Sequence, residues 1–212
     1  MHIPDGFLNA ATLAGTGVIS AGGIANAVRL VGTKIGEKQI PLMGIMAAFV
    51  FAAQMLNFPV AGGTSGHLMG AALCAILLGP WSAVIIMTLV LTAQALIFQD
   101  GGLLALGANI FNMGIVGGLG SYFIYRVLSG IAGHNRFLNL ANGFITAWLS
   151  VVLAAAACAF ELALSGTAPL RLVLPAMTAV HALIGIGEGL VTLAVLGLIK
   201  VSRPDLLVLH KV

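Results

Sequence analysis

The first two residues, Met1 and His2, carry three nitrogen atoms that can bind one metal ion together. They are the free α-amine of Met1, the backbone amide nitrogen of His2 and Nδ1 of the His2 ring. The amine and the amide close a five-membered chelate ring, and the amide and the imidazole close a six-membered one. The three donors therefore lie in one plane, which suits Ni²⁺ or Cu²⁺ and does not suit Zn²⁺ or Mg²⁺.

This chelate requires an unblocked amine, and two features of the sequence predict that the mature chain begins at Met1. No Lys or Arg precedes Arg29, so the basic region of a signal peptide is missing. The bulky side chain of His2 prevents removal of the initiator methionine. Because the amine binds metal only when it is unprotonated, metal binding should weaken as the pH falls.

The fourth corner of the square needs another donor, and His67 is the best candidate. It ends a stretch rich in Gly and Pro, NFPVAGGTSGH at 57–67, which cannot be helical. We expect an external loop that lies partly below the membrane surface, where irregular backbone is tolerated only against protein or a cavity. A His in such a place can also be a simple capping or hydrogen-bonding group. The loop residues expected to close over the metal are Asn57, Gly62, Gly63, Thr64, Ser65 and Gly66.

Further polar residues lie within apolar stretches, where burying them is costly. Gln94, Asn109 and Asn112 are candidates to orient the metal ligands from behind, or they form hydrogen bonds between helices. His181 and Glu188 are seven positions apart, so they share one helix face at a separation of ~10 Å. They line a cavity, with Glu188 passing cation charge inward, or a neighbouring helix satisfies each of them.

The elements that hold these residues follow from the composition. The chain has 212 residues, of which 60% are hydrophobic and 7% charged, and its mean hydropathy is +1.11. Soluble domains carry roughly 25% charged residues. A soluble fold of this size leaves too many residues in water to hide so much apolar surface. The composition therefore excludes a soluble enzyme and a disordered chain, and it predicts a multi-pass protein of the plasma membrane.

We expect an all-α bundle of seven transmembrane helices that forms a single metal-binding domain over residues 1–212. The third helix is short, because thirteen residues rise only ~20 Å against a bilayer core of ~30 Å. Gly and Pro residues mark the boundaries between the segments. The predicted spans are 8–30, 41–56, 67–79, 81–99, 106–128, 139–164 and 173–199.

Charge placement predicts the orientation, because Lys and Arg collect on the cytoplasmic side of a membrane. With seven crossings and the N-terminus outside, only Arg171 falls outside. If the third segment did not cross, Arg126 and Arg136 would also move outside. The C-terminus is therefore expected in the cytoplasm. The basic residues predicted inside are Arg29, Lys34, Lys38, Arg126, Arg136, Lys200, Arg203 and Lys211.

The sequence also excludes several activities. Nine basic residues spread along the chain form no stripe, which argues against a nucleic-acid partner. No Gly-Lys pair exists, so a phosphate-binding loop for ATP is absent. No Ser–His–Asp set or paired carboxylates indicate an enzyme, and nothing calls for an organic cofactor. We expect a capture subunit whose ATP is hydrolysed by partners; the alternative is a self-sufficient secondary metal permease coupled to protons through Glu188 or His181.

Three long motifs support this interpretation: MHIPDGFL at 1–8, NFPVAGGTSGHLMGAAL at 57–73 and FQDGGLLALGANIFNMG at 98–114. The sequence resembles, over essentially its whole length, the substrate-binding (S) component of cobalt/nickel energy-coupling-factor (ECF) transporters, the CbiM/NikM family. The resemblance implies a seven-helix fold, Ni²⁺ or Co²⁺ as the transported substrate, and ligation through Met1, His2 and His67. It also implies partners: a transmembrane coupling (T) subunit, two ABC-type ATPase subunits and often a small accessory membrane protein.

Overall fold

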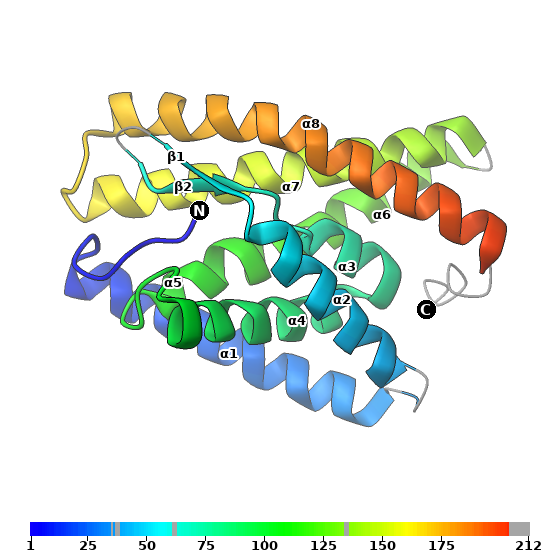
Figure 1. Cartoon of the computed structure of the whole chain (residues 1–212), viewed down its shortest axis with the longest axis horizontal. Coiled ribbons are helices and arrows are strands. Elements are labelled where there is room, and N and C mark those ends of the chain that lie inside the picture. The colour runs from blue at the N-terminus through cyan, green and yellow to red at the C-terminus, as the bar shows by residue number, and fades with distance from the viewer. Residues whose placement is uncertain (35, 37–38, 61–62, 134–135, 204–212) are drawn as a thin grey trace.

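The helices run along the long axis of the molecule as one bundle (Figure 1). The computed structural model describes residues 1–34, 36, 39–60, 63–133 and 136–203. Over these residues the chain forms seven continuous helical segments, which confirms the predicted all-α fold. The segments are α1 (Ala10–Lys34), α2 (Gln39–Gln54), α3 (Ala71–Leu78), α4 (Pro80–Ala93) continued by η1 (Gln94–Phe98), α5 (Leu106–Ile110) continued by η2 (Phe111–Leu119) and α6 (Gly120–Ala132), α7 (Arg136–Leu164) and α8 (Leu170–Ser202).

Five of these segments are long and apolar enough to cross a bilayer, which makes the chain a multi-pass membrane protein. They are the segments built on α1, on α4 with η1, on α5 to α6, on α7 and on α8. Helix α2 is apolar but has only 16 residues. Large apolar side chains lie exposed on the outside of the bundle, for example Val18, Leu183 and Ile131. In a bilayer these side chains face lipid tails, so their exposure carries no penalty.

The third helix is shorter than the predicted span 67–79. Helix α3 has 8 residues, which rise only ~12 Å. The chain stays extended through His67, and Gly70 then adopts a left-handed φ of 75°, so the helix cannot begin earlier. Every residue from Ala71 to Leu77 is buried, and α3 therefore lies inside the bundle without a lipid-facing side.

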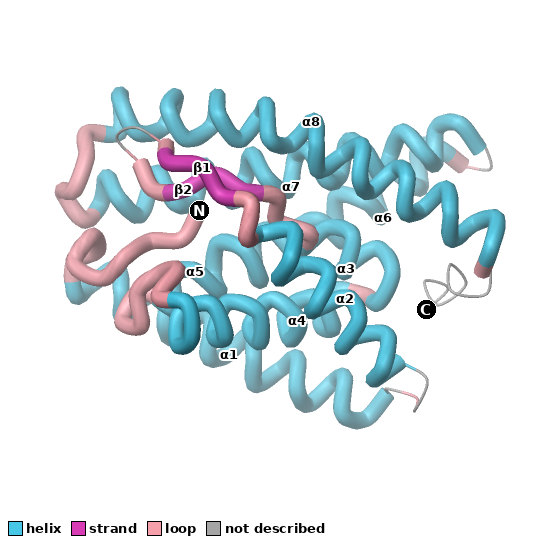
Figure 2. Tube along the Cα trace, viewed as in Figure 1, coloured by secondary structure: helices cyan, strands magenta, loops and turns pink. Residues whose placement is uncertain are grey.

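The stretch that precedes α3 is an antiparallel hairpin, so the prediction of an irregular loop was wrong. Strand β1 (Asn57–Pro59) pairs with β2 (Ser65–His67), with Asn57 opposite His67. The pairing gives backbone groups partners that the bilayer interior does not supply. The hairpin lies near Met1 in the view of Figure 2; β1 is exposed, and β2 contacts α8. Gly62, one of the predicted loop residues, lies outside the described residues.

Apart from Arg171 in the first turn of α8, the basic residues of the described helices lie toward one end of the bundle. The last turn of α1, the start of α7 and the last turn of α8 lie toward that end, away from the hairpin and from Met1 (Figure 1). This arrangement agrees with the charge argument from the sequence, although the side of the membrane that each end faces stays a prediction. Lys38 and Lys211, two of the basic residues used in that argument, lie outside the described residues.

Candidate metal centre

The N-terminal segment folds back into the bundle and ends there. Met1 and Ile3 are fully buried, and His2 is nearly so. The Ile3 amide donates to Asn109 Oδ1 at 2.8 Å, and Asn109 Nδ2 donates to the Ile3 carbonyl at 3.2 Å. The amide of Gly102 donates to that same carbonyl at 2.9 Å. These three bonds fix the direction in which the first two residues point.

Asp5 holds the next part of the segment against the loop that precedes α5. Its carboxylate accepts hydrogen bonds from three successive backbone amides, those of Leu103 (3.1 Å), Leu104 (2.8 Å) and Ala105 (3.1 Å). A carboxylate is favourable at this position because unpaired amides point out of a helix N-terminus. Gly102 allows the close approach, since a Cβ on it would lie 2.0 Å from Asp5 Oδ1. The sequence held no signal for this contact, because the partners are about a hundred positions apart.

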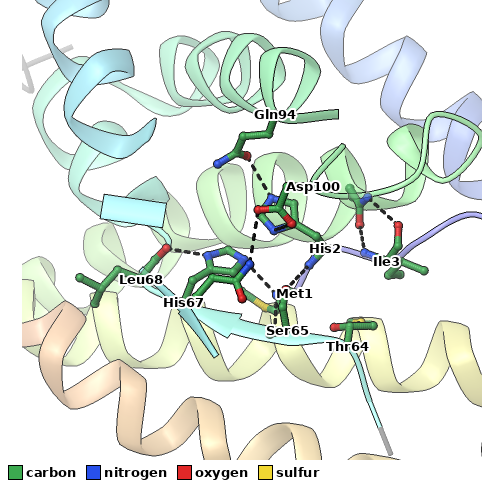
Figure 3. A network of polar contacts seen from close by, with 12 residues as sticks. Met1, His2, Ile3, Thr64, Ser65, His67, Leu68, Gln94 and Asp100 are labelled. Carbon is green, nitrogen blue, oxygen red and sulfur yellow. Dashed lines mark hydrogen bonds and ion pairs between the residues drawn. The ribbon is translucent and has the colours of Figure 1, made fainter. Parts of the chain in front are cut away.

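The Met1 amine lies against the His67 ring (Figure 3). The amine nitrogen is 2.9 Å from His67 Nε2. His67 Nδ1 donates to the Leu68 carbonyl at 2.8 Å, so Nδ1 carries the ring proton and Nε2 presents a lone pair. With metal–nitrogen bonds of ~2.0–2.1 Å, as imidazole makes to zinc, adjacent corners of a square are ~2.9 Å apart. The separation of these two atoms therefore fits two neighbouring donors of one planar site.

The His2 ring is oriented from behind by Gln94, at the junction of α4 and η1. His2 Nε2 lies 3.0 Å from Gln94 Oε1, which can only accept, so Nε2 carries the proton. His2 Nδ1 is left with a lone pair, is buried and has no hydrogen-bond partner. The ring stacks on that of His67, with centroids 4.5 Å apart and planes inclined by 25°. An orphaned buried nitrogen beside the His67 ring suits a metal ligand.

Ser65 on β2 holds the backbone of the first two residues. The Met1 amine donates to the Ser65 carbonyl and, at 3.0 Å, to the Ser65 hydroxyl oxygen. The His2 amide donates to the same hydroxyl oxygen at 3.1 Å. Of the four candidate nitrogens, the Met1 amine and His67 Nε2 are in contact, the His2 amide shares the Ser65 hydroxyl with the amine, and His2 Nδ1 belongs to the ring stacked on His67. The hairpin supplies one of them and orients two others.

Burial keeps the Met1 amine and the His2 ring uncharged. It lowers the pKa of the Met1 amine from 8.0 to about 5, and Cys158 and Asp100 only partly oppose the shift. Burial, followed by repulsion from the Met1 amine, lowers the pKa of His2 from 6.5 to about 4. At neutral pH both groups therefore keep their lone pairs. The N–H groups of the buried amine are paired with Ser65, and a metal ion is a partner for the lone pairs that remain.

Among the described residues, no group of three or more His, Cys, Asp or Glu side chains lies close enough to hold one ion. A metal site at His2 and His67 therefore needs a further donor, and the chain terminus is the one that the sequence predicts.

Not every predicted site residue lies near these donors. Gln94 and Asn109 contact the N-terminal segment, as expected. Asn112 does not, and the prediction that it orients a ligand group is corrected: its Nδ2 donates to Glu161 on α7 at 2.7 Å. Asn112 therefore makes a hydrogen bond between helices, the alternative that the sequence left open. In the hairpin, Thr64 lies 3.9 Å from the Cys158 thiol, and Asn57 reaches Asp100.

The prediction that Glu188 lines a metal passage is also corrected, whereas His181 lies close to the proposed donors, beside the Ser65 backbone and the Met1 amine. Glu188 accepts hydrogen bonds from the amides of Met69 (2.8 Å) and Gly70, at the start of α3. The space that it lines is only about 10 Å³, room for about one water. His181 Nδ1 bonds the Met177 carbonyl of its own helix at 2.7 Å. Glu188 thus stabilises the start of α3. No sign of this role is visible in the sequence, because the partners lie about 118 positions away.

Comparisons with known proteins bear on what such a site binds. A family model described as "Cobalt uptake substrate-specific transmembrane region" matches residues 2–206. A protein of Archaeoglobus fulgidus with the provisional name fused nickel transport protein NikMN is 42% identical over 213 residues, covering 98% of this chain and 68% of that protein. The cobalt transport protein CbiM of Sorangium cellulosum is 30% identical, covering 98% and 94%. The crystal structure of a truncated transition-metal transporter has a TM-score of 0.88 and 36% identity, covering 94% and 98%.

Proposed function

The chain belongs to the CbiM family of cobalt and nickel transport proteins, and from this membership we propose that it captures Ni²⁺ or Co²⁺ as the substrate-binding component of an ATP-driven ECF transporter. One observation carries the proposal more than any other. A chain terminus with a free amine is fully buried, 2.9 Å from an imidazole nitrogen. Ser65 accepts the hydrogen bonds of that amine, and metal capture gives a use to the lone pair that remains beside His67.

The proposed ligands are the four nitrogens of Met1, His2 and His67 described above. When the ion binds, the His2 amide gives up its proton and becomes a strong donor. Four nitrogens in a plane favour nickel, while membership of the family supports nickel and cobalt alike. Copper also binds such a site tightly, because affinities follow the Irving–Williams order, so selection against copper depends partly on which ions are available.

Release requires work that this chain has no motif to perform. We propose that the ion enters from outside, that the β1–β2 hairpin closes over it, and that ATP hydrolysed by partner subunits drives release inside. The partners are a transmembrane coupling subunit, two ABC-type ATPases and, as the resemblance suggests, a small accessory membrane protein. The rival proposal, a secondary permease driven by protons through Glu188, gains no support, because two backbone amides occupy that carboxylate.

Metal analysis and reconstituted uptake test the proposal together. Protein purified gently from nickel-supplemented cells should hold about one nickel ion per chain. In proteoliposomes, the chain alone should bind nickel without accumulating it, and accumulation should require the coupling subunit, the ATPases and ATP. Uptake by the chain alone under a proton gradient would establish the permease instead. Protein free of nickel and cobalt would refute both.

The pH dependence of nickel affinity follows from the lowered pKa values. Above pH ~6 the Met1 amine and His2 ring are already unprotonated, so nickel displaces only the His2 amide proton. The logarithm of the association constant should then rise about one unit per pH unit. Below the amine pKa of about 5, protons compete for the amine and then for His2, whose pKa is about 4. Affinity should fall more steeply there, with a slope of about two to three.

Isothermal titration between pH 4.5 and 8.5, corrected for the buffer, measures this slope. A break near pH 5 is the expected result. A slope of two that continues up to pH 8 would mean that the amine titrates as it does in water, and it would contradict the buried amine.

A further inference from the structure

Two segments cover the four nitrogens: the β1–β2 hairpin and the loop Gln99–Gly102 after η1. Met1 and His67 are fully buried, and His2 is 4% exposed. The loop packs so closely that a Cβ on Gly101 would lie 3.4 Å from the His2 ring. We expect an ion from outside to pass between the hairpin and this loop.

Asp100 is the charged residue of this loop, and its side chain contacts the hairpin. Its Oδ1 lies 3.3 Å from His2 Nδ1, and its side chain is 22% exposed. Its Oδ2 accepts a long hydrogen bond, 3.4 Å, from Asn57 on β1. The Asp100 carboxylate therefore contacts the donor His2 Nδ1, the hairpin residue Asn57 and solvent.

The other carboxylates of the described residues are engaged elsewhere. Asp5 binds the amides that precede α5, Glu161 accepts from Asn112, and Glu188 binds the start of α3. Within this part of the chain, Asp100 alone places a negative charge beside the proposed donors.

The contact between Asp100 and His2 brings two possible metal ligands together. With Gln94 Oε1 accepting from His2 Nε2, Nδ1 makes no hydrogen bond and faces the carboxylate oxygen. Two electron-rich atoms at 3.3 Å repel each other. A divalent cation between them would turn this repulsion into attraction, so the pair is arranged to share an ion.

Asp100 is held in this place by the residue that also orients His2. The Asp100 amide donates to the Gln94 carbonyl at 3.1 Å, and Gln99 takes a left-handed φ of 55° to allow the turn. The Gln94 side chain fixes the His2 ring. Gln94, at the junction of α4 and η1, thus positions both the Asp100 carboxylate and the His2 ring. The distance between these two groups is therefore fixed by the fold.

From this geometry, and resting on the function proposed above, we propose that Asp100 is the entry ligand. Its carboxylate replaces the first water of the incoming hydrated nickel ion and passes the ion to His2 Nδ1. Carboxylate oxygen suits an ion that still holds water, and nitrogen suits it once the water has left. When no ion is entering, the hydrogen bond from Asn57 holds the Asp100 carboxylate in place. Asp100 is not one of the four planar donors.

Stopped-flow measurement of Ni²⁺ binding to the full chain in detergent tests this proposal. Asp100→Asn keeps the shape and removes the charge. The association rate constant should fall at least about tenfold, as lost charge–charge guidance commonly does, while the dissociation rate does not rise and the final nickel spectrum is unchanged. Asp100→Glu should restore much of the rate. In ~1 M salt, where charges are screened within ~3 Å, the difference between wild type and Asp100→Asn should persist, because the contact is direct.

Each outcome decides between distinct accounts. An unchanged association rate in Asp100→Asn overturns the proposal. An unchanged association rate with faster dissociation would show that Asp100 holds the bound ion and does not admit it. A difference that vanishes in high salt would reduce Asp100 to long-range attraction. If the wild-type protein itself gives no planar nickel spectrum, the four-nitrogen site fails first, and that result is seen without any variant.

Discussion

Extending the chain before Met1 should abolish tight nickel binding. A Gly-Ser-Gly extension converts the amine into an amide and must force a fully buried atom away from His67 Nε2, which lies 2.9 Å away. Structural metal sites with four ligands yield ~10–16 kcal/mol, or about 3 kcal/mol per ligand. Losing the amine and distorting the amide next to it should therefore cost roughly 10⁴-fold in affinity. Isothermal titration with Ni²⁺ measures this loss.

The length of the extension matters. One added residue would place the His third in the chain, where a new amine, two amides and Nδ1 form a rival planar set. Three residues avoid that. The matched control is the same extension on the C-terminus, which should leave binding intact. A protease that cuts directly before Met1 should restore affinity to the extended protein. Tight binding by the uncut protein would refute the role of the amine.

Replacing His67 should have the second largest effect. His67→Ala removes one corner of the square and leaves the three nitrogens of the first two residues. The expected loss is roughly 10²-fold to 10³-fold in nickel affinity, about one ligand's share. Added imidazole should recover part of it by entering the space left by the ring. Equilibrium competition with a coloured nickel chelator measures both values.

Asn112→Ala is the matched control for this variant. His67 and Asn112 are both fully buried polar residues, so each substitution leaves a cavity and should destabilise the fold. Asn112 bonds Glu161 on α7 and is not among the four nitrogens. The control should therefore lose thermal stability and keep nickel affinity within about threefold. Equal loss of affinity in both variants would show that packing, and not ligation by His67, supports binding.

The sequence predicted the fold and the meeting of Met1, His2 and His67 because both follow from rules that need little tertiary information. Apolar composition and spacing give the helices, and the chelate is a property of two adjacent residues. That these residues bind metal stays a prediction. The extended chain at 57–67 was recognised as non-helical, but the pairing of Asn57 with His67 was missed, since that register depends on packing against α8.

What the sequence did not reveal is set by contacts between distant positions. Asp5 meets the loop before α5, and Glu188 meets the start of α3, through backbone amides that have no side-chain signature. Asn112 was assigned to the metal site, but it pairs with Glu161. Asp100, which directly follows the predicted span 81–99, was given no role. In each case a polar side chain in an apolar stretch indicated that a partner exists, while its identity required the fold.

X-ray absorption of the nickel-loaded wild-type protein identifies the atoms bound to the metal. We expect a planar nickel ion with four nitrogen neighbours and no oxygen or sulfur at bonding distance, in a diamagnetic state. Scattering from beyond these neighbours should show two imidazole rings. A six-coordinate nickel ion bound to oxygen, or a site with a single imidazole, would refute the four-nitrogen site.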